Sequence, residues 1–202
     1  FKKWGNESRL LEFGYSVSQI KKMVTVIGDA VRRAQKIVFA LKSFTQGSDQ
    51  ANSQPVSLPE GINTVLTLYR NRLKAGVELE LDWEGHPTVQ GVPEELGQVW
   101  TNLIQNALQA MDNHGKLKII IREEEKTTVI IEDSGPGVPP LLRERIFEPF
   151  FTTKKEGEGT GLGLHICKQI IERHQGEIWI GQGAEGAKFC VALPRHWETT
   201  HE

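Results

Sequence analysis

The chain has 202 residues and a mass of 22.7 kDa, enough for one full-sized domain with a smaller attachment. Hydrophobic residues make up 38% of the chain and charged residues 25%, which excludes collagen-like, disulfide-scaffold and wholly disordered proteins. The formal net charge of -2 provides no general attraction to nucleic acid or to an anionic membrane, so we expect neither as a partner of this segment.

The N-terminal part has its own charge balance and its own pattern. Residues 1–54 carry 9 basic and 4 acidic side chains, which indicates a separate part or, equally well, a solvated helix face. Apolar residues from Leu10 to Leu41 recur at alternating steps of three and four, and this heptad seam predicts one helix from about residue 8 to about residue 46. A lone helix of this kind leaves apolar surface in water, so region 1–46 is expected to self-associate or to join a bundle. The alternative is a long helix folded back on its own domain.

Residues 47–57 are polar, contain Gly and Pro, and predict a linker to a main domain over 58–194, which a tail of 195–202 follows. Periodicity predicts helices over 58–74, 93–111 and 161–174, strands over 77–83, 116–123, 127–134, 176–181 and 187–194, and a short extended piece at 88–91. A long loop rich in Gly and Pro spans 134–159. This order predicts an α+β fold, a two-layer sandwich in which helices cover one face of a mixed, mostly antiparallel sheet.

Cellular location is indicated by the cysteines and by the absence of targeting patterns. Cys167 and Cys190 lie in apolar, periodic segments, so we expect buried, reduced thiols and a cytoplasmic compartment. No apolar run has the length of a membrane span, and no signal peptide is visible. Because the chain starts at Phe1 rather than Met, we expect a fragment of a longer protein, whose membrane anchor could lie upstream.

Two asparagines lie on the helix predicted over 93–111. Asn102 and Asn106 are four residues apart and therefore share one face at the edge of the apolar stripe. A carboxamide oxygen is a neutral, hard ligand, suited to a Mg²⁺ ion whose other ligands are water and phosphate oxygens. Taken alone, the pair is more typical of ordinary solvated asparagines than of a metal site.

A second candidate site is the segment EDSGPGVPP, at the end of a predicted strand. Asp133 would stand at the strand tip, and Gly135 and Gly137 allow backbone conformations that a flat ligand can approach closely. A carboxylate there can accept a hydrogen bond from an exocyclic amine such as that of adenine. The simpler interpretation is a turn of Asp, Gly and Pro.

Glycines at 157, 159, 161 and 163 lead directly into the helix predicted over 161–174. Free backbone N–H groups and the positive end of the helix dipole favour a polyphosphate at such a start. The pattern matches neither the P-loop nor the dinucleotide fingerprint. In the preceding segment RIFEPFFTTKK, three phenylalanines predict a loop that folds down over an occupied site or packs on the core, and Lys154 and Lys155 are placed to meet phosphate.

Together and in this order, these segments resemble the catalytic ATP-binding domain of sensor histidine kinases, in the superfamily that includes gyrase and MutL. NLIQNALQAM resembles the N box, EDSGPGVP the G1 box, IFEPFFTTK the F box and GTGLGL the G2 box. The resemblance covers about Leu58 to Pro194. Within it, the segment NALQAM is similar to the same motif in kinases of the nitrogen-regulation type.

The resemblance implies ATP and Mg²⁺ as ligands and gives each motif residue a role. Asn106 would coordinate Mg²⁺, with Asn102 one turn before it, and Asp133 would bind adenine in a pocket shaped by Gly135 and Gly137. The residues implied at the phosphates are Gly159, Thr160, Gly161, Leu162 and Gly163. The resemblance also implies a lid over roughly residues 135–161, with Lys154 as a contact from it. Ala187 departs from the family, because many relatives place Thr there, which puts one water-mediated adenine contact in doubt.

The heptad segment resembles the second helix of the dimerization and phosphotransfer hairpin that precedes such domains. The resemblance therefore implies a homodimer through the N-terminal helix, and a receiver domain of a response regulator as a partner. The phosphorylated His normally lies on the first helix of the hairpin. No His occurs before His86 in this chain, so the acceptor is expected on an upstream helix outside it.

Three functions follow from these patterns. The first is a protein-histidine kinase fragment, in which imidazole is itself the nucleophile and no water-activating base is needed. The second is an ATP-driven clamp of the gyrase or MutL kind. Such relatives place a general-base Glu four residues before the metal-binding Asn, where this chain has Asn102, whose amide cannot take a proton from water. The third, a structural dimer with a decayed nucleotide site, is disfavoured by the intact glycines and Asp133.

Overall fold

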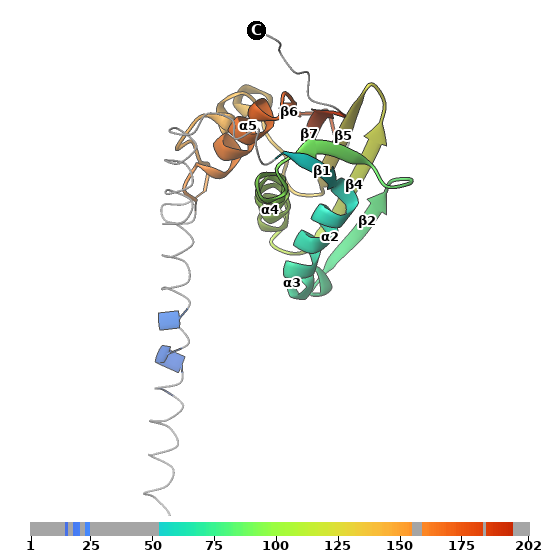
Figure 1. The fold of residues 1–202 in the computed structure, drawn as a ribbon. Helices are drawn as coiled ribbons and strands as arrows, with labels where there is room; N and C mark the ends of the chain where they lie inside the picture. The colour runs from blue at the N-terminus through green and yellow to red at the C-terminus, as the bar shows by residue number, and fades with distance from the viewer. Residues whose placement is uncertain are drawn as a thin grey trace, which may run out of the picture. The chain divides into compact units, whose positions relative to one another are not determined.

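The computed structural model describes residues 15, 18–20, 23–24, 53–154, 159–183 and 185–195 (Figure 1). The chain divides into two compact units, Phe1–Lys42 and Ser43–Glu202. The described residues of the first unit are helical, and Ile20 and Val24 of the predicted seam are exposed. The rest of the helix predicted over 8–46 lies outside the described residues, as do residues 47–52 of the predicted linker and 196–202 of the tail. Among the described helices, none has the length and hydrophobicity that crossing a membrane requires.

In the second unit, helices pack on one face of a five-stranded sheet (Figure 1). The elements in chain order are β1 Gln54–Ser57, α2 Leu58–Leu68, α3 Arg70–Lys74, β2 Val77–Asp82, β3 Thr88–Gly91, α4 Pro93–Ala110, β4 Gly115–Glu123, β5 Lys126–Asp133, the 3-10 turns η2 Pro140–Leu142 and η3 Arg145–Phe147, α5 Gly163–Arg173, β6 Glu177–Ile180 and β7 Lys188–Pro194. The sheet order is β2-β4-β5-β7-β6, and only the β2–β4 pair among these is parallel. The predicted α+β sandwich is confirmed.

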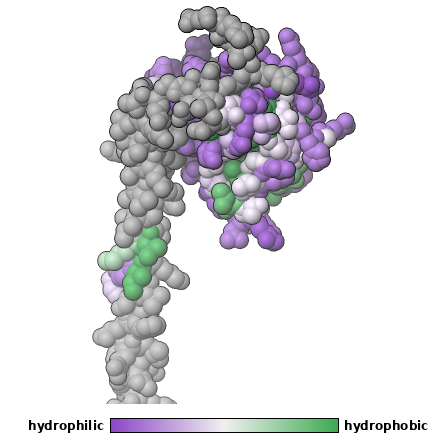
Figure 2. All heavy atoms as spheres, in the orientation of Figure 1, coloured by the Kyte–Doolittle hydropathy of each residue, from purple (hydrophilic) through white to green (hydrophobic). Residues whose placement is uncertain are grey.

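The position of α4 follows from two periodicities that meet in the core. Along β4, Leu117, Ile119 and Ile121 are buried, whereas Lys116 and Lys118, which alternate with them, face the other side of the sheet. The buried stripe of α4 repeats at helical spacing and consists of Leu96, Val99, Trp100, Leu103, Ile104, Ala107 and Leu108. On the face shown in Figure 2, polar residues predominate over the described surface of the second unit, with scattered hydrophobic ones among them.

Two local features differ from the sequence prediction. The single helix expected over 58–74 ends at Leu68 and restarts at Arg70, and Arg72 on the second piece donates to Oδ1 of Asn113 at 2.7 Å, a tertiary contact that periodicity does not encode. Residues Gln54–Ser57, assigned to the linker, form β1 and pair antiparallel with β3 in a separate two-stranded sheet. Their polar sequence with Pro55 is untypical of a strand. Proline is nevertheless tolerated here, because both strands of a two-stranded sheet are edge strands.

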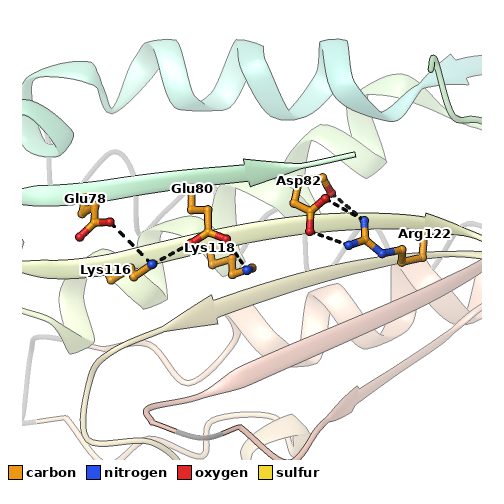
Figure 3. A network of polar contacts seen from close by, with 6 residues as sticks. All are labelled: Glu78, Glu80, Asp82, Lys116, Lys118 and Arg122. Atoms are coloured by element: carbon orange, nitrogen blue, oxygen red, sulfur yellow. Dashed lines mark hydrogen bonds and ion pairs between the residues drawn. The ribbon is translucent and has the colours of Figure 1, made fainter. Parts of the chain in front are cut away.

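Ion pairs connect the edge strand β2 to β4 on the face of the sheet away from the helices (Figure 3). The residues of this ladder are Glu78, Glu80 and Asp82 on β2 and Lys116, Lys118 and Arg122 on β4. Lys116 Nζ lies 2.7 Å from Oε2 of Glu80, Lys118 contacts the other oxygen, and Arg122 binds both carboxylate oxygens of Asp82. Hydrogen bonds from Lys116 and Lys118 lower the pKa of Glu80 from 4.5 to about 2.

Acid is therefore expected to weaken the β2 edge through Glu80. Because the pKa of Glu80 is lowered by folding, its stabilising contribution is fully present above 4.5 and is lost as the pH falls through about 2. In urea unfolding, the midpoint of the native chain should exceed that of Glu80→Gln at about pH 6, and the difference should shrink between 4.5 and about 2. Other carboxylates titrate in both proteins and cancel. A difference that stays constant across this range would contradict the prediction.

Candidate nucleotide-binding site

Helix α4 carries the two predicted asparagines, and they contact different partners. Asn102 is 5% exposed and its Nδ2 donates to the backbone oxygen of Gly163 at 3.3 Å, which links α4 to the start of α5. Asn106 is half-buried, and its Oδ1 accepts a hydrogen bond from Nζ of Lys154 at 3.3 Å. The structure thus brings together residues from α4, the loop after η3 and the start of α5. The carboxamide oxygen of Asn106 already contacts a cation, so its donor type fits a bound Mg²⁺.

Asp133 ends β5 as a buried carboxylate, with 3% of its surface exposed. Its Oδ1 accepts two backbone hydrogen bonds, from Gly135 N at 2.9 Å and from Ala187 N at 3.3 Å. Oδ2 accepts none from the described part of the chain. Burial raises the pKa of Asp133, and the two backbone N–H groups counteract this only in part. A buried carboxylate with one oxygen left for a donor is suited to recognising an amine.

Glycines form the backbone around Asp133, at positions where a side chain does not fit. Gly137 has φ +74°, and a Cβ there would lie 2.8 Å from the oxygen of Gly186. Gly186 has φ +69°, and a Cβ there would lie 1.8 Å from the oxygen of Asp133. At Gly135 the Cβ would lie 2.8 Å from Oδ1 of Asp133. From the sequence, GAEGAKFCVALP is only similar to the glycine and strand that close such domains, and nothing in it indicated that Gly186 lies against Asp133.

The predicted phosphate segment packs against the loop that precedes it. Gly161 has φ +66°, and a Cβ there would lie 2.3 Å from the backbone carbon of Phe150, while one at Gly159 would lie 2.7 Å from Oγ1 of Thr152. The hydroxyl of Thr160 accepts from the N–H of Leu162 at 3.4 Å, and Leu162 is buried. Within the described part of the chain, no side chain caps the start of α5, so its first N–H groups can take an anion. Gly157 and Lys155 lie outside the described residues.

The three phenylalanines before this segment differ in burial. Phe147 is buried, and its backbone oxygen lies 3.1 Å from Nδ1 of His165 on α5. Phe150 is 74% exposed, and Phe151 is half-buried with the Arg145 guanidinium 4.7 Å from its ring centre. Of the two interpretations that the sequence left open, packing on the core holds for Phe147 and not for Phe150. A loop that folds down over an occupied site stays a prediction.

Residues 91–196, more than half of the chain, match the family described as histidine kinase-, DNA gyrase B-, and HSP90-like ATPase. The chain belongs to this ATPase family. Two curated relatives are similar to it. Sporulation kinase A of Bacillus subtilis is 32% identical over 84% of this chain and 28% of the relative. The signal transduction histidine-protein kinase AtoS of Escherichia coli is 33% identical over 86% of this chain and 29% of the relative. The chain thus spans less than a third of the length of either relative.

Solved structures agree with this family. The catalytic domain of the histidine kinase ThkA is 34% identical, with a TM-score of 0.66 over 71% of this chain and 96% of that one. A complex of ThkA with the response regulator TrrA has a TM-score of 0.69 at 29% identity and covers 87% of this chain and 51% of that one. The histidine kinase catalytic domain that the sequence predicted is confirmed.

Proposed function

We propose that this ATPase-family domain binds Mg-ATP and transfers its γ-phosphoryl group to a histidine on a separate helix, as the catalytic part of a two-component histidine kinase. The observation that carries the proposal is the buried Asp133, whose second carboxylate oxygen is left for a donor within a frame of glycines. That oxygen would accept the exocyclic amine of adenine, and Gly135 and Gly137 would let the ring approach the backbone.

The other roles follow from the neighbouring elements. Residues 159–163 would surround the phosphates at the start of α5, where no described side chain caps the helix, and Asn106 would hold Mg²⁺ through Oδ1. When bound, Mg²⁺ neutralises phosphate charge and orients the phosphoryl group. Lys154 would add a positive charge from the preceding loop.

The reaction itself requires no base from this domain. The lone pair of a neutral imidazole nitrogen forms the new P–N bond while the bond from the γ-phosphorus to the bridging oxygen breaks, and ADP leaves. The proton on the other ring nitrogen then passes to solvent. Binding and charge neutralisation are therefore the tasks of the residues described above. The acceptor histidine would come from outside this sequence, since its first histidine is His86 in the loop before β3.

An ATP-hydrolysing clamp of the gyrase kind is the alternative, and Asn102 argues against it. Its amide is buried and donates to Gly163, so it neither takes a proton from water nor is free to turn toward one. Efficient hydrolysis would need a base from elsewhere.

We further propose a homodimer through the N-terminal helix, a receiver domain as partner and a cytoplasmic location. The ThkA complex supports the receiver partner, since it contains the response regulator TrrA bound to a similar kinase. Cys167 and Cys190 are buried thiols, as the sequence predicted, which fits a reducing compartment.

The test is phosphoryl transfer to a separate polypeptide. The chain is incubated with Mg²⁺, ATP labelled at the γ-phosphate, and a separate polypeptide that carries the histidine-bearing helix expected outside this sequence. Acid-labile, base-stable label on that helix is the expected result, and Asp133→Asn should abolish it at low ATP concentration. Rapid phosphate release with no labelled protein would instead favour the clamp and would mean that Asn102 is no obstacle to hydrolysis.

A further inference from the structure

Lys154 connects the loop after η3 to the last turns of α4. Its Nζ lies 3.3 Å from Oδ1 of Asn106 and 2.5 Å from Oε1 of Gln109. Asn106 and Gln109 are three residues apart on one helix face, so both oxygens point at the same ammonium group. Gln109 and Lys154 are exposed, and neither is needed for the core.

The ammonium group and a divalent cation require the same oxygen. In the proposed function, Oδ1 of Asn106 is the protein ligand of Mg²⁺, and a carboxamide oxygen that accepts an ammonium hydrogen at 3.3 Å cannot also face a metal ion without strong charge repulsion. Gln109 does not take part in this competition between the lysine and Mg²⁺, because the proposed function gives it no contact with the metal. Its oxygen accepts the shorter hydrogen bond from Lys154.

We propose that Gln109 is a positioning residue that holds the Lys154 ammonium on Asn106, so that the lysine competes with Mg²⁺ for the Asn106 oxygen. This inference rests on the proposed function, because it concerns the metal of that site. It adds a role for Gln109, which no sequence motif indicated. Metal binding then has to move Lys154 off Asn106, and the strength of the Gln109 contact sets how much Mg²⁺ is required.

The test measures Mg²⁺ binding rather than turnover. ADP is titrated into the chain by calorimetry at a series of Mg²⁺ concentrations and in EDTA, which gives the Mg²⁺ concentration at half of its effect on ADP affinity. Gln109→Leu removes the oxygen that holds the lysine, and this concentration is expected to fall about 3- to 10-fold, a range reduced for solvent exposure. Gln98→Leu, the same change three turns earlier on α4, should leave it at the native value.

A double substitution separates positioning from a general effect. If Gln109 acts through the lysine, Lys154→Met with Gln109→Leu should match Lys154→Met alone in Mg²⁺ dependence. Additive effects would overturn the proposal, and so would a Gln109→Leu variant with native Mg²⁺ dependence. Should the native chain bind no ADP at all, the proposed function itself would fail, and that result is visible before any variant is made.

Discussion

Gly186→Ala is expected to destabilise the second unit by more than about 4 kcal/mol and to abolish nucleotide binding. The added Cβ would lie 1.8 Å from the backbone oxygen of Asp133, and φ is +69°, so both sterics and backbone conformation oppose the change. The atom in the way belongs to the main chain of β5, which cannot turn aside as a side chain can. Relief requires β5 and the segment before β7 to separate, and Asp133 then loses its hydrogen bond from Ala187.

The matched control is Gly85→Ala. Gly85 has φ +67°, nearly the same strain, but its Cβ would meet no atom within 4 Å. The free energy of unfolding of this variant should fall only by the cost of placing alanine in the left-handed backbone region, about 1–2 kcal/mol. Urea unfolding and ADP calorimetry on both variants measure the difference, and equal losses would refute the steric argument.

Asp133→Asn is expected to lower ADP affinity about 10- to 100-fold while leaving the fold as stable as before, or more stable. The asparagine oxygen can still accept from Gly135 and Ala187, but an NH₂ group would replace the second oxygen and face the donating amine of adenine. Folding raises the pKa of the Asp133 carboxyl. Its protonated form therefore stabilises the fold at pH values below the pKa of the unfolded chain, and this stabilisation is lost as the pH rises through the pKa of the folded chain. At neutral pH the buried carboxylate is costly to desolvate, and a neutral asparagine amide avoids that free-energy cost.

The pH dependence of binding provides a second measurement of the same residue. A donor amine favours the carboxylate, so ADP affinity of the native chain should decrease as acid protonates Asp133, and Asp133→Asn should lack this decrease. Calorimetric titrations at several pH values, with urea unfolding as the check on folding, measure both effects. Unchanged affinity in the variant would show that the adenine assignment is wrong.

Periodic segments made most of the fold predictable. The alternation of β4 and the helical stripe of α4 define a buried face by themselves, so both elements were found from sequence to within about one residue. By contrast, β1 depends on pairing with β3, more than 30 residues away, and nothing local in Gln54–Ser57 indicates a strand.

The candidate site shows the same division. Asp133 and its glycines are adjacent in sequence, and a short motif indicates them. Gly186 became visible only once β5 and β7 were paired, since that pairing places it against Asp133. Gln109 looked like any polar residue at a helix end until the fold placed Lys154 beside it.

Strand β2 reaches its only partner in the five-stranded sheet, β4, after the chain has passed through β3 and α4. Closing this long crossover costs entropy that only non-local contacts return, so β2 is expected to join the sheet late during folding. The strand that joins last is also expected to open first in the native protein, and that strand is β2. The ion pairs of the ladder stabilise β2 against this local opening. Amide hydrogens of β2 should accordingly exchange with solvent sooner than those of β5, which is paired on both sides.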